Sequence, residues 1–304
     1  MRINLFLASL SAVFNLGCSS KSPEKTDDSM VVAGEVKGKP VKNHQRVVAI
    51  GDLHADVDRA KEVFRLAKLI DEKDNWIAKN TLVVQTGDLT DRGADGKETL
   101  QFIRKIEKQA DGKFITLIGN HEAMNVMGDL RYVNPADTAG FGGAEKRKQA
   151  FSPGGEWYEW ILSHEVIVNV EGNLFAHGGL SATYQSVPLN ELSERVRQAI
   201  KSGNRTPEIG RDGPMWYRGH LQAPESAACE EIDKVLAAQN AKRIVVGHTT
   251  QRSGRITARC DGKIIGIDIG LSDHYGANIG YLEIRDDDAR AIYPTESIDI
   301  PDPQ

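Results

Sequence analysis

Apolar runs that end in glycine and a polar residue recur along the chain, and this pattern constrains the fold more than any other feature. Three of them, RVVAIGD, TLVVQTGD and KFITLIGN, follow one another in the first half. Apolar residues recur at helical spacing from Val57 to Ala67, which predicts a helix over about residues 57–70, and a similar spacing from Leu100 to Ala110 predicts another. Strands that alternate with helices are typical of α/β proteins.

The order of these segments predicts a large folded region behind an N-terminal leader. At 304 residues the chain can bury a substantial core, as one α/β domain or as two smaller ones. We assign residues 1–17 to a signal peptide, 18–44 to a flexible polar linker and 45–304 to one domain. Glycine clusters and the run EWYEWI mark residues 124–163 as an insertion, with a helical pair inside the core as the alternative. A second insertion, polar and helical, extends over about 181–241.

The leader has the features of an export signal. Arg2 precedes an apolar stretch over residues 5–14, which is too short for a membrane-spanning helix. The triplet that ends in Cys18 resembles the cleavage box of bacterial lipoproteins, except that Asn15 stands where that box prefers an aliphatic residue. We therefore expect an exported protein, in the periplasm or at the outer surface of a bacterium. Lipidation at Cys18 and simple export are the two alternatives.

Charge and cysteine content restrict the partners. The formal net charge of -5 argues against a nucleic-acid partner, which would need a basic face. Contact with a membrane is expected only through the lipid anchor. An exported location permits a disulfide between Cys229 and Cys260, and two buried free thiols fit the sequence equally well.

Side chains that can bind metal stand at the ends of five predicted strands. Each follows an apolar run beside a glycine, which lets the backbone turn inward at the edge of a sheet. A single histidine there is more often a hydrogen-bonded core residue, and a single aspartate is an ordinary turn residue. Five such strand ends together favour a metal site, and the mixture of carboxylate, imidazole and amide groups suits Mn, Fe or Zn. The residues are Asp52 with His54, Asp88, Asn120, His177 and His248.

Five motifs in this order resemble those of the calcineurin-like metallophosphoesterases, in particular their phosphoprotein-phosphatase branch. They are GDLHAD at 51–56, GDLTDRG at 87–93, GNHE at 119–122, HGGL at 177–180 and GHTT at 247–250. The segments WYRG and GIDIG also resemble the Shewanella-like protein phosphatases. The resemblance implies a four-layer α/β/β/α sandwich of two mixed sheets with helical insertions.

The resemblance also implies two divalent or trivalent metal ions, Mn, Fe or Zn. Asp88 would bridge them, because the family holds both ions with the aspartate at this position. The ligands of one ion would be Asp52, His54 and Asp88. Those of the other would be Asp88, Asn120, His177 and His248.

The implied reaction is hydrolysis of a phosphate monoester by a hydroxide that the two metals share. Water between two metals loses its proton near neutral pH and attacks the phosphorus in line. His121 is the expected general acid and Asp91 would keep its imidazolium charged. Arg92 and Arg218 would bind the phosphoryl oxygens. Asp268 would orient a ligand from behind, with an ordinary turn aspartate as the alternative.

The expected substrate is a phosphorylated protein or a small phosphate ester. The motifs DRG and GNHE occur together, and Thr250 stands where many phosphodiesterase relatives carry a metal-binding histidine, so a monoester is favoured. Phosphotyrosine or an aryl phosphate is the favoured monoester, and we expect Trp157, Tyr158 and Trp160 to wall its pocket. The alternatives are a hydrolase of dinucleoside polyphosphates or other small phosphate esters, and a lipoprotein that binds metal or phosphate without turnover.

Other phosphatase and protease mechanisms do not fit. A thiol phosphatase needs an arginine six positions after its cysteine, and Val235 and Gly266 stand there instead. Neither His-Glu pair continues as a zinc-protease motif, and the chain has no glycine-rich Walker loop.

Overall fold

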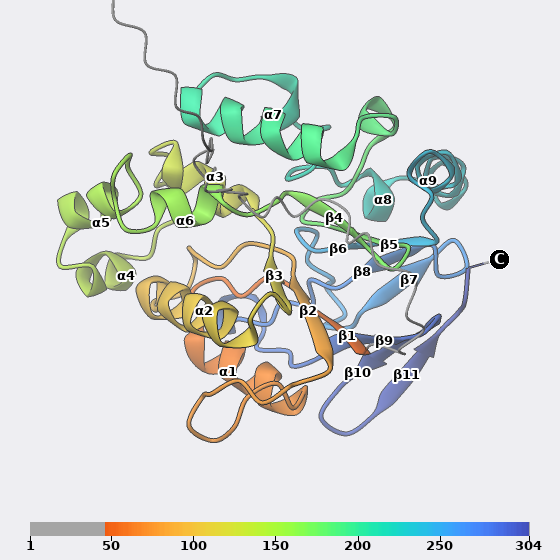
Figure 1. Ribbon diagram of the computed structural model, residues 1–304, viewed down its shortest axis with the longest axis horizontal. Helices are drawn as coiled ribbons and strands as arrows, with labels where there is room; N and C mark the ends of the chain where they lie inside the picture. Colours follow the sequence, from red (N-terminus) through yellow and green to blue (C-terminus); the bar gives the residue numbers. More distant parts are fainter. Residues whose placement is uncertain (1–45, 304) are drawn as a thin grey trace, which may run out of the picture. The chain divides into compact units, whose positions relative to one another are not determined.

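Two β-sheets packed face to face form the centre of the structure (Figure 1). The computed structural model describes residues 46–303. The predicted signal peptide, the linker and Cys18 lie outside these residues. No helix within this described range is both long enough and apolar enough to span a bilayer.

The first sheet has the strand order β11-β10-β9-β1-β2-β3. β1 pairs in parallel with β2 and antiparallel with β9, so the sheet is mixed. Its strands are β1 (Arg46–Ile50), β2 (Thr81–Gln85), β3 (Phe114–Thr116), β9 (Tyr281–Arg285), β10 (Asp288–Ile292) and β11 (Ser297–Ile300).

The second sheet has the order β4-β5-β6-β8-β7 and is also mixed, with β5, β6 and β8 parallel. Its strands are β4 (Ile167–Val170), β5 (Asn173–Ala176), β6 (Arg243–Val246), β7 (Thr257–Arg259) and β8 (Ile264–Gly266).

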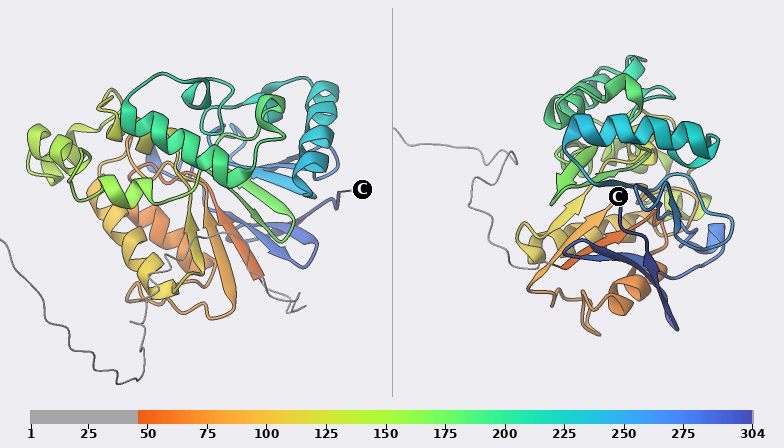
Figure 2. Two further views of the ribbon diagram at one scale, coloured as in Figure 1. Left: turned by 45° about the horizontal axis from the view of Figure 1, so that its top comes forward. Right: turned by 90° about the vertical axis from the view of Figure 1, so that its right-hand side faces the viewer.

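Helices cover the outer faces of both sheets. The α-helices are α1 (Val57–Leu66), α2 (Gly96–Ala110), α3 (Asn120–Val126), α4 (Pro135–Gly140), α5 (Ala144–Ala150), α6 (Tyr158–Leu162), α7 (Leu189–Ser202), α8 (Gly219–Gln222) and α9 (Glu225–Gln239). Figure 2 shows α1 and α2 beside the first sheet, and α7 and α9 beside the second. Short 3₁₀ turns lie at Ala182–Tyr184, Pro207–Ile209 and Asp273–Tyr275.

The alternation of side chains along the strands produces these layers. Val47 and Ala49 of β1 pack with Phe175 of β5 in the apolar cluster between the sheets. Val48 points the other way and belongs with Phe64 of α1 to the cluster beneath the helices. Because successive strand residues face opposite sides, each buried strand contributes to two cores. The predicted α/β/β/α sandwich is confirmed.

The structure shortens one predicted helix and gives the secondary structure of residues 124–163. The helix expected over 57–70 ends at Leu66, because Lys68 takes a left-handed backbone with φ 56° that a helix does not accommodate. Residues 124–163 form short helices whose apolar side chains, Phe151 and Trp157 among them, join the main core cluster. This region therefore packs as part of the core beside α2.

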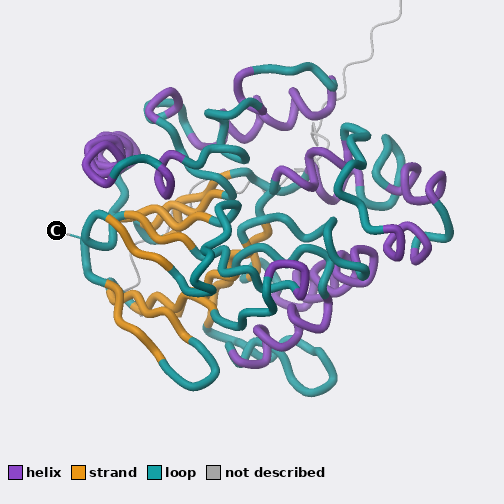
Figure 3. Tube along the Cα trace, turned by 180° about the vertical axis from the view of Figure 1, so that it is seen from behind, coloured by secondary structure: helices purple, strands orange, loops and turns teal. Residues whose placement is uncertain are grey.

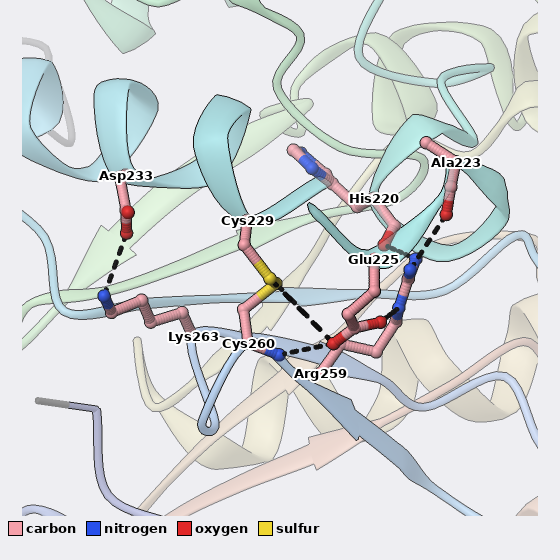
Figure 4. The surroundings of a disulfide bond; sticks show 8 residues. All are labelled: His220, Ala223, Glu225, Cys229, Asp233, Arg259, Cys260 and Lys263. Atoms are coloured by element: carbon pink, nitrogen blue, oxygen red, sulfur yellow. Dashed lines mark hydrogen bonds and ion pairs between the residues drawn. A yellow bond between two sulfur atoms is a disulfide. The ribbon is translucent and has the colours of Figure 1, made fainter. Parts of the chain in front are cut away.

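Cys229 in α9 and Cys260 at the end of β7 form a disulfide, which the sequence left open (Figure 4). Arg259, next to Cys260, donates hydrogen bonds to the carbonyl oxygens of His220 at 2.6 Å and Ala223 at 2.8 Å. The disulfide and this arginine together hold α8 and the start of α9 against the edge of the second sheet.

Candidate metal centre

The predicted ligands come together because both sheets direct their parallel strands to the same place. Asp52 follows β1 and Asp88 follows β2, which is parallel to it. His177 follows β5 and His248 follows the parallel strand β6. Figure 3 shows the loops beyond the strands running close together next to the sheet ends. The carboxyl ends of parallel strands are where α/β proteins commonly place their ligand sites.

Close backbone packing explains the glycines that accompany these residues. A Cβ atom at Gly119 would overlap Oδ1 of Asp88, and one at Gly247 would overlap Oδ1 of Asp52. Five of the non-glycine site residues take left-handed backbone conformations, namely His54 at φ 44°, Asp88 at φ 55°, Asp91 at φ 69°, Arg92 at φ 71° and His248 at φ 61°. Such strain is costly and is tolerated mainly where function requires one side-chain direction.

The ligand atoms form two clusters that share Asp88. His54, Asp88 and His121 make one, and Asp88, His177 and His248 make the other, with the ligand atoms of each cluster within 4.8 Å of one another. All five side chains are buried. Asp88 therefore belongs to both clusters, and the first of them contains His121 where the resemblance implied Asp52.

The other two predicted ligands lie against these clusters. Asp52 Oδ2 is 3.9 Å from Nε2 of His54. Oδ1 of Asn120 is 2.9 Å from Nε2 of His177. The structure thus brings all six predicted ligand side chains together, while their role as ligands stays a prediction.

The ring nitrogens of these histidines have different partners, and Nε2 of His177 faces Oδ1 of Asn120. Nδ1 of His177 lies 2.8 Å from the carbonyl oxygen of Thr86, and Nδ1 of His54 lies 3.3 Å from that of Thr90, which leaves each Nε2 for the centre. Nε2 of His248 is buried and has no hydrogen-bond partner among residues 46–303. A backbone carbonyl that holds the second ring nitrogen is the usual support of a metal-bound histidine.

Electrostatics also favour bound cations. Burial, with the nearby carboxylates of Asp268 and Asp88, raises the pKa of Asp52 well above its usual value. Burial lowers the pKa of His54 to about 3 and that of His248 to about 2, so both imidazoles are neutral and can donate a lone pair. Positive charge between these groups would relieve the repulsion of the carboxylates. The donor set therefore fits two metal ions of the Mn, Fe or Zn class.

Glu122 shapes the loop that carries Asp88, a role that was not predicted from the sequence. Its buried carboxylate accepts the backbone N–H groups of Asp88 and Leu89 at 2.8 Å each, and those of Thr90 at 3.2 Å and Gly119 at 3.0 Å. The sequence signal that could have indicated this role is the position of Glu122 in the motif GNHE. A carboxylate that ties two strand-end loops together fixes where Asp88 points.

His121 is paired with Asp91 as predicted, and a buried network stands behind the pair. Nδ1 of His121 lies 2.8 Å from Oδ2 of Asp91. The other oxygen of Asp91 accepts from Asn125 at 3.0 Å and from Arg147 of α5 at 3.3 Å. Arg147 is 1% exposed and also pairs with Asp137 at 2.7 Å. Arg147 and Asn125 lie in the first insertion, so that region supports the site.

Burial alone would lower the pKa of His121, but Asp88 and Asp91 outweigh it and raise the pKa above its ordinary value. The protonated imidazole is favoured, which is the form that a general acid needs.

The two predicted phosphate arginines lie at the rim. The guanidinium of Arg92 stacks over the ring of Tyr132 at 3.9 Å, and its buried Nε has no hydrogen-bond partner within the described range. Nη1 of Arg218 donates to the carbonyl oxygen of His248 at 2.7 Å. Asp268 is buried next to these groups, and its Oδ1 accepts the N–H of Gly270 at 3.1 Å.

The expected aromatic wall is wrong. Trp157 is 0% exposed and packs in the core with Arg104 stacked on its ring at 4.0 Å. Trp160 donates through Nε1 to Glu107 of α2 at 2.8 Å, and Tyr158 is buried in the same cluster. The run EWYEWI has the spacing of a core helix, and its indoles fill the space beside α2.

Other aromatic rings line the centre instead. Ring centroids lie 5.2 Å apart for Tyr132 and His121, 4.8 Å for Tyr275 and His54, and 5.6 Å for Trp216 and His248. These three residues lie outside the α-helices and strands, where the sequence offered little periodic signal.

Comparison with known proteins identifies the family. The family model for calcineurin-like phosphoesterases matches residues 45–252. Shewanella-like protein phosphatase 1 of Plasmodium berghei is 33% identical over 271 residues, which cover 83% of this chain and 75% of that protein. Shewanella-like protein phosphatase 2 of Arabidopsis thaliana is 32% identical over 297 residues, which cover 80% and 76%.

A solved structure leads to the same family. The crystal structure of a cold-active protein-tyrosine phosphatase from a psychrophilic Shewanella species matches with a TM-score of 0.74 and 26% identity, over 84% of this chain and 80% of that one. The chain belongs to the calcineurin-like phosphoesterase family and is a metal-dependent phosphatase related to the Shewanella-like protein phosphatases.

Proposed function

We propose that the protein is a dinuclear-metal phosphomonoesterase that acts on phosphorylated protein, with phosphotyrosine or an aryl phosphate preferred. The observation that carries the proposal is the pair of ligand clusters sharing Asp88, next to a buried His121–Asp91 pair. The aryl preference is supported by the rings of Tyr132, Tyr275 and Trp216 around the centre, and by the similarity to a structure described as a protein-tyrosine phosphatase.

The two metal ions would be held by the residues that the motifs implied, with Asp88 between them. When bound, they supply an activated water and neutralise the charge of the phosphoryl group. His54 and His248 offer neutral nitrogens without a proton having to leave first. Glu122 holds the backbone of Asp88 in place throughout.

His121 would give a proton from Nε2 to the leaving oxygen of the ester. Asp91 accepts the hydrogen bond of Nδ1, which fixes the ring orientation and favours the charged form. Asn125 and Arg147 hold Asp91 in turn.

Arg92 would bind the phosphoryl oxygens, because its buried Nε has no hydrogen-bond partner among residues 46–303 and its plane is stacked on Tyr132. Arg218 would contribute the N–H groups that its bond to His248 does not use. Planar guanidinium groups are well suited to phosphate oxygens.

Removing the metals should abolish the reaction. We expect about two Mn, Fe or Zn ions per purified chain and turnover of para-nitrophenyl phosphate that a chelator removes and added metal restores. The same chelator saturated beforehand with the metal found in the protein is the control and should leave turnover unchanged. Full activity in protein shown by elemental analysis to be metal-free would overturn the proposal.

Substrate comparison separates the remaining alternatives. Phosphotyrosyl peptide should be turned over faster than phosphoseryl peptide and faster than dinucleoside tetraphosphate. A higher rate on the tetraphosphate would favour the small-anion hydrolase instead. A protein that binds metal and phosphate without any turnover would be the lipoprotein alternative, in which the His121–Asp91 pair has no use.

We also propose that the protein is exported to the periplasm or outer surface of a bacterium and anchored at Cys18. The support is the leader sequence alone. Cell fractionation of the native chain and of a Cys18→Ala variant tests it, because only the native chain should sediment with membranes. Recovery of both in the cytosol would rule out export.

A further inference from the structure

A cavity of about 790 Å³ opens beside the metal centre. Residues 209–212, 216–219 and 222–223 line it, so the whole cavity is built from the second insertion. Neither the ligand clusters nor the His121–Asp91 pair form any part of its wall. Its contents would therefore lie next to the reacting groups without taking part in the chemistry.

Two residues of the cavity wall also contact the centre. Arg218 lines it and donates to the carbonyl oxygen of His248 at 2.7 Å. Trp216 also lines it, and the ring of Trp216 lies 5.6 Å from that of His248. A molecule whose phosphate is held between Arg92 and Arg218 would have its neighbouring atoms at the mouth of this cavity.

The wall is held in place by contacts outside the cavity. Ser181 donates to the carbonyl oxygen of Asp212 at 2.8 Å, and the hydroxyl of Tyr217 donates to Glu231 of α9. The N–H of Gly178, next to ligand His177, donates to the carbonyl of Pro214 at 2.7 Å. The cavity is thus formed before a ligand arrives, which reduces the entropy lost on binding.

The charge of the wall favours an anionic occupant. Arg211 is exposed and makes no ion pair or hydrogen bond among residues 46–303. With Arg218 it faces a single carboxylate, Asp212, on the cavity wall. Ile209 and Trp216 add apolar surface between the charges. Mixed apolar and cationic surface suits the side chains of an acidic peptide segment better than a polyphosphate chain, which is charged throughout.

A second hollow has the opposite charge. Its volume is about 340 Å³, half of its lining residues are acidic, and its one arginine, Arg59, is already paired with Glu62 and Asp273. An acidic segment would be repelled there. The carboxylates are Asp56, Asp58, Glu62, Asp95 and Asp273.

We propose that the Trp216–Arg218 cavity binds acidic residues on one side of the phosphorylated residue in a polypeptide substrate. The inference rests on the proposed phosphatase function and adds the sequence context that the enzyme selects. Arg211 is the specificity residue, since it is the free cation on the wall. The two hollows differ in charge, so acidic residues are recognised on only one flank of the phosphorylated residue.

Matched phosphotyrosyl peptides test the proposal. The peptides carry glutamate, glutamine or lysine on the N-terminal flank only or on the C-terminal flank only. For one flank, glutamate should raise kcat/KM about twofold to fivefold over glutamine, mainly through KM, as expected for partly exposed ion pairs. The preference should shrink as salt is added, because exposed charges are screened.

Variants of the cavity wall give the second readout. Arg211→Gln should abolish the preference for glutamate, and Arg211→Glu should shift it toward lysine. Gln222→Glu, which adds a charge to another wall position, should act in the same direction as Arg211→Glu. Arg290→Gln on β10, an exposed arginine paired with Asp299, is the matched control and should keep the preference.

The outcomes separate this inference from the proposed function. If the metal-loaded protein did not hydrolyse para-nitrophenyl phosphate, the proposed phosphatase function would be overturned. Turnover of that ester with equal efficiency for all peptides, or a preference that survives in Arg211→Gln, would overturn only the cavity assignment. A larger loss for dinucleoside tetraphosphate than for peptide in Arg211→Gln would make the cavity a nucleotide site and overturn it as well.

Discussion

The Asp88→Asn variant is expected to lose about a thousandfold or more in kcat, because a dinuclear centre contributes several kcal/mol to the transition state and each 1.36 kcal/mol is tenfold in rate. Asp88 belongs to both ligand clusters, so one substitution weakens both sites at once. Asparagine keeps the shape of the side chain and removes one negative oxygen. Metal content should fall together with kcat, and elemental analysis beside para-nitrophenyl phosphate kinetics measures both.

An exposed aspartate provides the comparison for Asp88. Asp233 of α9 is half-exposed and pairs with Lys263, so Asp233→Asn removes the same charge outside the ligand clusters and should leave rate and metal content unchanged. Circular dichroism of the Asp88→Asn protein should match that of the native protein, because Glu122 still holds the loop by its backbone. An Asp88→Asn protein that keeps two ions and the native rate would rule out a bridging role.

The His121→Asn variant is expected to lower kcat by about a hundredfold to ten-thousandfold on esters with poor leaving groups, which is the usual contribution of general acid catalysis. The loss should be much smaller for para-nitrophenyl phosphate, because nitrophenolate leaves without a proton. Rates on a series of aryl and alkyl phosphates of rising leaving-group pKa therefore measure the effect directly.

Metal content decides between two roles of His121. This residue lies in a ligand cluster with His54 and Asp88, as well as beside Asp91. A general acid can be replaced without loss of metal, whereas a ligand cannot. If His121→Asn lowered kcat equally for all esters and the variant also contained one metal ion fewer, His121 would be a metal ligand. Asp91→Asn is the companion variant and should show the same dependence on leaving group with a smaller amplitude.

The sequence contained enough to place the strands and the residues that follow them. Each apolar run ends where a chemically distinctive side chain begins. Parallel pairing places Asp52 beside Asp88 at one edge of the first sheet, and His177 beside His248 at one edge of the second. The packing of the two sheets then brings the two pairs together. The order of the motifs resembles that of the calcineurin-like metallophosphoesterases, and this resemblance implied the layered fold. Local pattern was sufficient because these residues are fixed by the strand they follow.

Residues that act from another element were not predictable in this way. Arg147 reaches Asp91 from a helix 56 positions later, and nothing in its own neighbourhood indicates that contact. The same holds for Tyr132, whose ring is stacked on Arg92. The assignment of Trp157 failed for the reverse reason. An aromatic run is compatible with a pocket or a core, and only the packing against α2 decides between them.

The bond between Cys229 and Cys260 makes substrate recognition dependent on how the chain matures. Arg259, next to Cys260, donates hydrogen bonds to the carbonyl oxygens of His220 and Ala223. These bonds hold helix α8, and Arg218 lies directly before α8. Protein produced under reducing conditions should therefore have a more mobile Trp216–Arg218 cavity and an intact metal centre. Such a preparation would hydrolyse small esters normally yet discriminate poorly among peptides, so oxidation state has to be controlled before selectivities are compared.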